Sequence, residues 1–174
     1  MKKRIIVNIF VLSLFLVGTS LLYAGTKHSH EANVIKVDKD GNKIALCGCG
    51  HEVKVTSSTA KVVDGDDTYY VCSDKCQAAL SQNLNKMKPA LQLKVEKAKV
   101  KAGTMGNVYH VGEDGALTAK CACGMDVKVT DKTISRTLNG EKYYLCSDGC
   151  AAQFDKNPAK VAEMAKKKMK KKSM

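Results

Sequence analysis

The sequence has no tryptophan and only three phenylalanines among its 174 residues, and its remaining aromatic side chains are six tyrosines. Large apolar side chains are therefore scarce, and a small domain built from so few of them has a thin hydrophobic core. Such domains are usually stabilised by disulfides or by a bound metal ion. The chain holds eight cysteines, which can supply either kind of cross-link.

The cysteines form two groups of four that repeat along the chain. The first group is Cys47, Cys49, Cys72 and Cys76, and the second is Cys121, Cys123, Cys146 and Cys150. Each group is a C-x-C pair followed by a C-x3-C pair, and every cysteine of the second group lies 74 residues after its counterpart. The repeat predicts two tandem modules of about 65 residues each rather than one larger domain.

Alternating valines and turn residues predict that each module opens with β-hairpins. The expected strands are residues 33–37, 43–46, 107–111, 116–119, 134–138 and 141–145, with shorter strands around the valine pairs at 53 and 55 and at 127 and 129. Asn139-Gly140, between the last two strands, is a strong hairpin signal. The return strand of the first hairpin in each module ends on the first two thiols.

Helices are expected to follow the hairpins, so the fold class is α+β with one or two C-terminal helices per module. Ser73 and Ser147 are good N-caps for helices over residues 74–82 and 148–156. Cys76 and Cys150 then lie at the third helical position, where free N–H groups and the helix dipole favour a thiolate. Pro89 and Pro158 are expected to begin a further helix in each module, the first of them reaching about residue 101.

Four thiols brought together at one point suit a soft or borderline cation. A tetrahedral set of four sulfurs suits Zn(II), and thiolates also suit Cu(I) and toxic soft ions such as Cd(II). The expected cofactor is one zinc or copper(I) ion per module, held by the four cysteines of that module, so that all eight cysteines are expected ligands. His51 and Met125 occupy the same offset after each C-x-C pair. Each is either a supplementary ligand or a packing or surface residue.

This arrangement resembles the TRASH/YHS family of small domains found in heavy-metal trafficking, resistance and sensing proteins. The residues that carry the resemblance in the second module are Cys123-Gly-Met125, Val127, Tyr143-Tyr144, Cys146-Ser-Asp-Gly-Cys150, Phe154 and Asn157-Pro158. The first module matches at Cys49-Gly50, Val53, Tyr69-Tyr70, Cys72-Ser-Asp and Cys76, but has His51, Leu80 and Leu84 in place of the Met, Phe and Pro. The resemblance implies a treble-clef-like fold, in which a knuckle, a β-hairpin and a helix surround the ion. Cys47 and Cys121 are additional upstream thiols relative to the family's three-cysteine pattern.

The first 24 residues have the pattern of a secretory signal peptide, with a basic start, an apolar stretch and Ala24 at its end. Export to the periplasm is expected, and an uncleaved N-terminal membrane anchor facing outside the cytoplasm is the alternative. Residues 25–32 are expected to be a flexible leader. His28 and His30 in this leader either bind a divalent metal such as Cu(II) or Zn(II) or are part of a polar segment without such a role.

The formal net charge of +12 is not evenly spread, because basic residues gather at Lys2, Lys3 and Arg4 and again near the C-terminus. Lysines 166, 167, 168, 170, 171 and 172 form a basic run. It either contacts an anionic membrane surface weakly or is a solvated helix end. Aromatic residues are not interleaved with it, which argues against nucleic-acid binding. The expected organisation is a signal peptide (1–24), a leader (25–32), a first module (33–101), a linker (102–106), a second module (107–166) and a basic tail (167–174).

Three functions fit these patterns. The first is an exported protein that captures soft metal ions or passes them on, with a metal transporter or another exported metal protein as partner. The second is a disulfide-stapled structural or partner-binding module, because export would place the thiols in an oxidising compartment. The third is a thiol–disulfide oxidoreductase, which the absence of a C-x-x-C motif and of a thioredoxin-like βαβ pattern disfavours. The first function is favoured, and the protein is not expected to be an enzyme.

Overall fold

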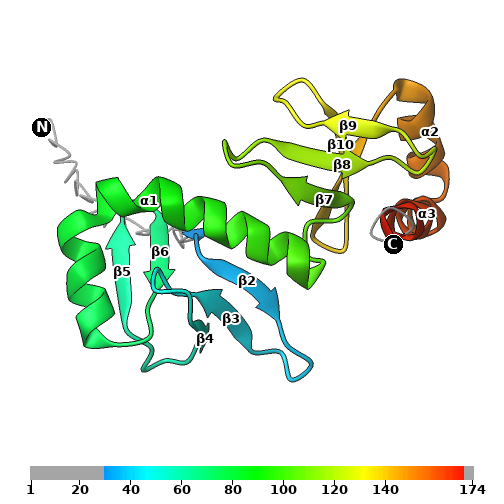
Figure 1. Ribbon diagram of the computed structural model, residues 1–174. Coiled ribbons are helices and arrows are strands. Elements are labelled where there is room, and N and C mark those ends of the chain that lie inside the picture. Colours follow the sequence, from blue (N-terminus) through cyan, green and yellow to red (C-terminus); the bar gives the residue numbers. More distant parts are fainter. Residues whose placement is uncertain (1–29, 171–174) are drawn as a thin grey trace, which may run out of the picture.

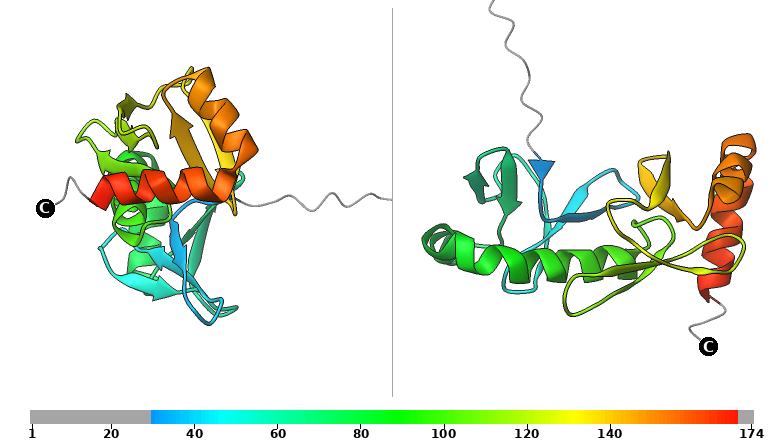
Figure 2. Two further views of the ribbon diagram at one scale, coloured as in Figure 1. Left: turned by 90° about the vertical axis from the view of Figure 1, so that its right-hand side faces the viewer. Right: turned by 90° about the horizontal axis from the view of Figure 1, so that it is seen from above.

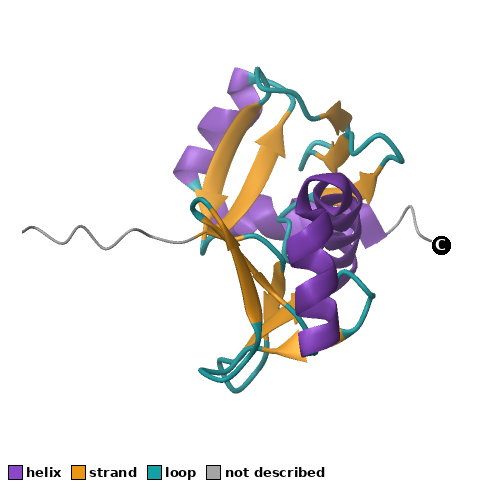
Figure 3. Cartoon of the chain, turned by 90° about the vertical axis from the view of Figure 1, so that its left-hand side faces the viewer, coloured by secondary structure: helices purple, strands orange, loops and turns teal. Residues whose placement is uncertain are grey.

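The computed structural model describes residues 30–170, which form two modules of similar plan joined by a long helix (Figure 1). The first module contains β1 (His30–Glu31), β2 (Val34–Val37), β3 (Lys43–Leu46), β4 (Glu52–Lys54), β5 (Lys61–Asp64), β6 (Asp67–Tyr70) and α1 (Asp74–Ala102). The second contains β7 (Val108–Val111), β8 (Leu117–Lys120), β9 (Asp126–Lys128), β10 (Ile134–Leu138), β11 (Glu141–Leu145), α2 (Asp148–Lys156) and α3 (Pro158–Lys170). Figure 3 shows that both modules combine helices with strands, as expected for an α+β protein.

Each module contains a three-stranded antiparallel sheet, β2-β3-β4 in the first and β7-β8-β9 in the second. Both sheets have a register shift in their first hairpin, between Val34 and Lys36 in one and between Val108 and His110 in the other. The turn between β2 and β3 is closed by Asp38, whose carboxylate accepts a hydrogen bond from the backbone N–H of Asn42. The return strands β3 and β8 lead directly into the first two cysteines, as predicted.

A second hairpin in each module leads into the other two cysteines. Strands β5 and β6 pair in the first module, and β10 and β11 pair in the second over the two ranges that were predicted. Asn139 and Gly140 both have positive φ angles, of 51° and 81°, which the tight turn of the β10–β11 hairpin requires. The short strand β1 pairs in parallel with β6. His30 and Glu31, expected in a flexible leader, are therefore part of the first module's sheet.

The predicted N-caps of the helices are confirmed. The side-chain oxygens of Ser73 and Ser147 accept hydrogen bonds from the backbone N–H groups of Cys76 and Cys150. Helix α2 covers the predicted range, and α3 begins at Pro158.

The prediction that Pro89 begins a separate helix is wrong. Helix α1 continues past Pro89, and its single non-helical residue is Asn83, with φ −128° and ψ 22°. Asn83 lies 74 residues before Asn157, the residue between α2 and α3, so the chain bends at the same point in both modules. The helix continues past the proline because Leu91 and Val95, beyond it, are buried against the first module's sheets.

Each module has its own hydrophobic core. The first core is built around Leu80, Leu91 and Val95 of α1, together with strand residues. In the second core, Tyr143 and Phe154 pack with their ring centroids 5.5 Å apart. Leu80 and Phe154 are repeat counterparts, so the second module has an aromatic pair where the first has a smaller side chain.

The long helix α1 also connects the two modules. It lies along the first module and reaches the second, whose helices α2 and α3 are at the opposite end of the molecule from the start of α1 (Figure 2). Val100, near its end, packs against the second module's core, and Lys97 forms an ion pair with Glu113 at 2.6 Å. The expected linker, residues 102–106, contacts both modules. The Thr104 hydroxyl donates to the Ile35 carbonyl at 2.8 Å, and Gly106 lies against the backbone of Lys142.

The expected basic tail begins inside a helix, because α3 extends to Lys170. Among residues 30–170, no helix is both long and apolar enough to span a membrane. The expected signal peptide, His28 and the last lysines of the basic run lie outside the described residues.

Candidate metal centres

The structure brings the eight cysteines together as two tetrads, one in each module. The first tetrad is Cys47, Cys49, Cys72 and Cys76, and the second is Cys121, Cys123, Cys146 and Cys150. Within each tetrad the four sulfur atoms lie within 4.8 Å of one another. All eight cysteines are free thiols. The chain therefore contains two four-cysteine clusters that can each hold a metal ion.

The first two thiols of each tetrad lie on a tight turn between two strands. In the first module the turn joins β3 to β4, the N–H of Cys47 donates to the His51 carbonyl at 2.9 Å, and the N–H of Gly50 donates to the Cys47 carbonyl at 2.8 Å. The second module repeats both bonds with the same lengths, through Cys121 and Gly124. Gly50 has a φ of 96°, a conformation that strongly favours glycine. The glycine after each C-x-C pair allows the turn that presents both sulfurs.

The other two thiols flank a helix N-terminus. Cys72 follows β6, and Cys76 is the third residue of α1, where its N–H is capped by Ser73. The Cys72 sulfur lies 3.5 Å from that of Cys76 and 3.4 Å from that of Cys49 on the turn. In the second module, the sulfur of Cys146 lies 3.4 Å from that of Cys123 and 3.6 Å from that of Cys150. Two separate structural elements thus converge on one point in each module.

A buried asparagine holds these two elements together, a feature that the sequence analysis missed. Asn107 is fully buried, and its amide nitrogen donates to the carbonyls of Lys120 at 2.9 Å and Tyr144 at 2.7 Å. Its amide oxygen accepts from the N–H of Tyr144 at 2.8 Å. Lys120 directly precedes Cys121, and Tyr144 is two residues before Cys146. Asn107 therefore ties the strand before the first thiols to the strand before the second.

The first module has the same clamp at the equivalent position. Asn33, 74 residues before Asn107, is also fully buried and bonds the Leu46 carbonyl at 2.9 Å and both backbone groups of Tyr70. Comparing the two repeats residue by residue could have singled out this asparagine, because it is identical in both. Its role could not be read from strand periodicity, which places it only at the start of a strand.

The thiols of a tetrad differ in burial. Cys47 and Cys121 are buried, whereas Cys49, Cys72 and Cys123 are exposed. Burial raises the pKa of the Cys47 thiol above its ordinary value. The two tetrads are thus surface sites, each with one sulfur anchored in the module's core and at least one open to solvent.

The clustered thiols also shift one another's protonation. The backbone N–H of His51 stabilises the thiolate of Cys49 and lowers its pKa to about 6. Hydrogen bonds to Cys49 and Cys76 raise the pKa of Cys72 to about 12. In the second tetrad, burial and a hydrogen bond to Cys123 raise the pKa of Cys146 to about 12. Several thiolates this close repel one another, and a bound cation would remove that repulsion.

A lysine lies beside the turn in each module. The Lys94 ammonium group donates to the Gly48 carbonyl at 3.2 Å. The side chain of Lys168, the repeat counterpart of Lys94, passes beside Gly124. A divalent cation bound by four thiolates leaves a net charge of −2, so a nearby ammonium group favours the loaded site.

The sulfur geometry fits a tetrahedral ion. Zinc–sulfur bonds of about 2.3 Å place the sulfurs of a regular tetrahedron about 3.8 Å apart. The observed separations of 3.4–3.6 Å, with all pairs below 4.8 Å, are close to this spacing. A disulfide would instead need sulfurs about 2.0 Å apart. The donor set is soft, which also suits Cu(I).

The histidines singled out from the sequence have different surroundings. The Nδ1 atom of His51 lies 3.5 Å from the sulfur of Cys49, so this side chain is next to the first tetrad. His30 instead pairs with Asp67, with its Nδ1 atom 3.0 Å from the carboxylate. The metal site expected at His28 and His30 is not tested, because His28 lies outside the described residues.

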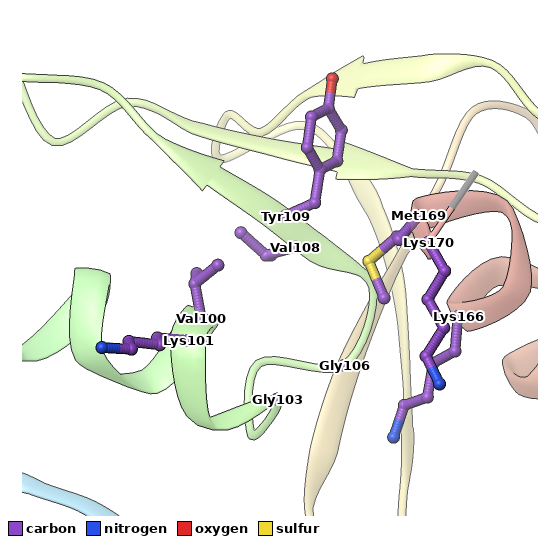
Figure 4. A pocket seen from close by; sticks show the side chains of 9 residues that line it. All are labelled: Val100, Lys101, Gly103, Gly106, Val108, Tyr109, Lys166, Met169 and Lys170. Atoms are coloured by element: carbon purple, nitrogen blue, oxygen red, sulfur yellow. The ribbon is translucent and has the colours of Figure 1, made fainter. Parts of the chain in front are cut away.

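A separate cavity of about 710 Å³ lies where α1 meets the second module (Figure 4). It is lined by Val100, Lys101, Gly103, Gly106, Val108, Tyr109, Lys166, Met169 and Lys170. This lining contains neither cysteine nor histidine nor an acidic residue, so it is not a metal centre. Its apolar floor belongs to the junction between the two modules.

Comparison of the chain with protein-family models, with curated proteins and with solved structures finds no match. The function is therefore argued from the geometry and chemistry of the two tetrads.

Proposed function

We propose that this protein captures soft metal ions and passes them on, binding one zinc or copper(I) ion in each module. The observation that carries the proposal is the convergence of four sulfurs within 4.8 Å, twice in one chain. Four sulfurs at this spacing match the donor type and geometry that Zn(II) prefers, and fewer of them suffice for Cu(I).

The exposure of the tetrads supports exchange of the ion rather than permanent burial. In the first tetrad, Cys49 and Cys72 are both exposed, so an accepting protein or chelator can reach two of the four sulfurs. Metal moves between thiol sites by ligand exchange, which requires such access. The buried sulfur of Cys47 keeps one ligand fixed while the others are exchanged.

A bound ion would also stabilise each module. The cores are small, and the two elements that carry the thiols are joined by the core, by one buried asparagine and by the tetrad itself. Binding to the folded form alone stabilises that form, and structural zinc in small domains contributes strongly to folding. Capture and stabilisation are therefore two consequences of one site.

We also propose that the modules are of the TRASH/YHS type. The support is the shared motif, together with the order of a thiol-bearing turn, a β-hairpin and a helix N-terminus around each tetrad. Such a treble-clef-like arrangement places one thiol pair on the turn and the other at the helix. A role in heavy-metal trafficking or resistance follows from this resemblance.

Export is part of the proposal and rests on residues 1–24, whose pattern is that of a signal peptide. A periplasmic location would make an exported metal protein or a metal transporter the natural exchange partner. The lysines at the end of α3 support weak contact with an anionic membrane surface, where such a transporter would lie.

The test is metal binding by the full chain under anaerobic conditions. Titration with Co(II), a spectroscopic stand-in for Zn(II), should give the intense charge-transfer bands of a tetrahedral thiolate site and saturate at two ions per chain. Bound ions should protect the thiols from a thiol reagent. Absence of these bands with disulfide-bonded cysteines would instead favour the disulfide-stapled alternative, and absence of the bands with free thiols would overturn metal capture.

A further inference from the structure

The two tetrads are close copies except at one donor-bearing position. The residue after the turn glycine is His51 in the first module and Met125 in the second. The backbone carbonyls of both residues accept the equivalent hydrogen bond, from Cys47 and Cys121 respectively. The backbone role is thus the same in both modules, and only the side chain differs.

The side chain of His51 lies next to an exposed thiol of the first tetrad. Its Nδ1 atom is 3.5 Å from the sulfur of Cys49, and both residues are exposed. The four sulfurs lie within 4.8 Å of one another, and the imidazole is not a member of this group. The imidazole is therefore beside Cys49 and outside the cluster of four sulfurs. From there it can join the ligand set or replace Cys49 when that thiol is exchanged.

The side chain of Met125 is 61% exposed. This is notable because the protein has few large apolar residues with which to fill its cores. An exposed methionine contributes little to packing. Met125 follows the exposed Cys123 at the same two-residue offset at which His51 follows Cys49, so the backbone carries a thioether donor at the equivalent position of the second module. Two side chains next to the thiols are the same in both modules, since Ser73 and Lys94 have identical counterparts in Ser147 and Lys168.

From the contact of His51 and the equivalent, exposed position of Met125 we infer that the two sites take different ions, with His51 selecting Zn(II) in the first and Met125 selecting Cu(I) in the second. The inference rests on the proposed metal-binding function. Imidazole is a borderline donor that suits Zn(II), whereas a thioether is a soft donor that suits Cu(I) and contributes little to zinc. One chain would then carry one ion of each kind.

The experiment measures the affinity of each site for Zn(II) and Cu(I), by anaerobic competition with chromophoric chelators. Cys146→Ser/Cys150→Ser leaves the first tetrad intact, and Cys72→Ser/Cys76→Ser leaves the second. The ratio of zinc to copper affinity should be at least about tenfold higher at the first site, a typical size for the effect of a residue beside the primary ligands. His51→Met should lower this ratio at the first site about tenfold, and Met125→His should raise it at the second.

The full chain provides a second measurement in case a serine variant does not fold. X-ray absorption of the zinc-loaded chain should show a nitrogen neighbour that His51→Met removes, and Met125→His should add one. His110→Met, which changes an exposed histidine of β7, is the matched control and should leave the spectrum unchanged.

The outcomes separate this inference from the function on which it rests. Equal ratios at both sites, unaltered by either swap while both ions still bind, would overturn the inference and leave metal capture in place. Binding of only one of the two ions would overturn the inference alone, and binding of neither would overturn both.

Discussion

The side-chain amide of Asn107 pairs with both backbone groups of Tyr144, accepting its N–H at 2.8 Å and donating to its carbonyl at 2.7 Å. In a β-ladder a neighbouring strand would satisfy these groups, but here one side chain does so. Tyr144 is two residues from Cys146, so the bonds also fix where β11 delivers its thiol. The asparagine and the tetrad thus hold the same two elements together at adjacent points.

Replacing this asparagine should therefore weaken both the fold and the metal site. Asn107→Ala would remove the side-chain partner of three backbone groups, which are buried or partly buried, and should lower the free energy of unfolding of the second module by about 2–4 kcal/mol. Urea denaturation of the metal-loaded protein measures this loss. Asn85→Ala, on the exposed side of α1, is the control and should change stability by less than about 0.5 kcal/mol. Equal stability of the two variants would show that the clamp contributes nothing.

Gly106 is predicted to tolerate no side chain. It has a φ of 59°, and a Cβ atom there would collide with the carbonyl of Lys142. Gly106→Ala should cost about 1–3 kcal/mol from this overlap, in addition to about 1 kcal/mol of backbone strain. Gly41→Ala is the matched control, because Gly41 also has a positive φ, of 81°, but open space around it. A smaller loss of thermal stability for Gly106→Ala than for Gly41→Ala would contradict the close contact.

Acidification should remove one contribution to the stability of the first module. A hydrogen bond from Lys88, and a further one from His30, hold the pKa of the Asp67 carboxyl below its usual value. Because the folded state favours the ionised form, this stabilisation is present above the ordinary aspartate pKa and is lost as the pH falls through the lowered one. Asp67→Asn should reduce the melting temperature at pH 7, and the difference from the parent protein should shrink towards pH 3. A difference that stays constant over this range would contradict the assignment, and Asp131→Asn, at an exposed aspartate, serves as control.

Loss of the second tetrad should unfold one module and spare the other. Cys146→Ser/Cys150→Ser removes both thiols at the start of α2, so a bound ion can no longer join that helix to the β8–β9 turn. Amide signals of the second module should collapse in an NMR spectrum, while those of α1 before Val100 should persist, because Leu91 and Val95 belong to the first core. An unchanged spectrum would show that metal is not needed for the fold.

Much of this architecture follows from local sequence signals. Ser73 and Ser147 are recognisable as caps because a hydroxyl at that position satisfies a free N–H of the first turn. Asn139-Gly140 is recognisable as a hairpin turn because both residues tolerate positive φ. The two tetrads were predicted from the cysteine spacing, because each module has one thiol pair on a turn and another at a helix start. A hairpin between the two pairs reverses the chain and lets them meet.

Features that depend on distant contacts could not be predicted in this way. The continuity of α1 past Pro89 depends on the burial of Leu91 and Val95, and local preference gave the opposite result. The pairing of His30 with Asp67 in β1–β6 joins residues 37 positions apart. The clamp formed by Asn107 likewise spans 37 residues, and strand periodicity carries no information about which backbone groups a side chain will bond.

The most direct test of the central claim is native mass spectrometry of the full chain purified without reductant from the compartment in which it resides. The account predicts a mass that includes two metal ions, with eight free thiols recovered once the ions are chelated. A metal-free chain lighter by eight hydrogens, the mass lost when four disulfides form, would contradict it.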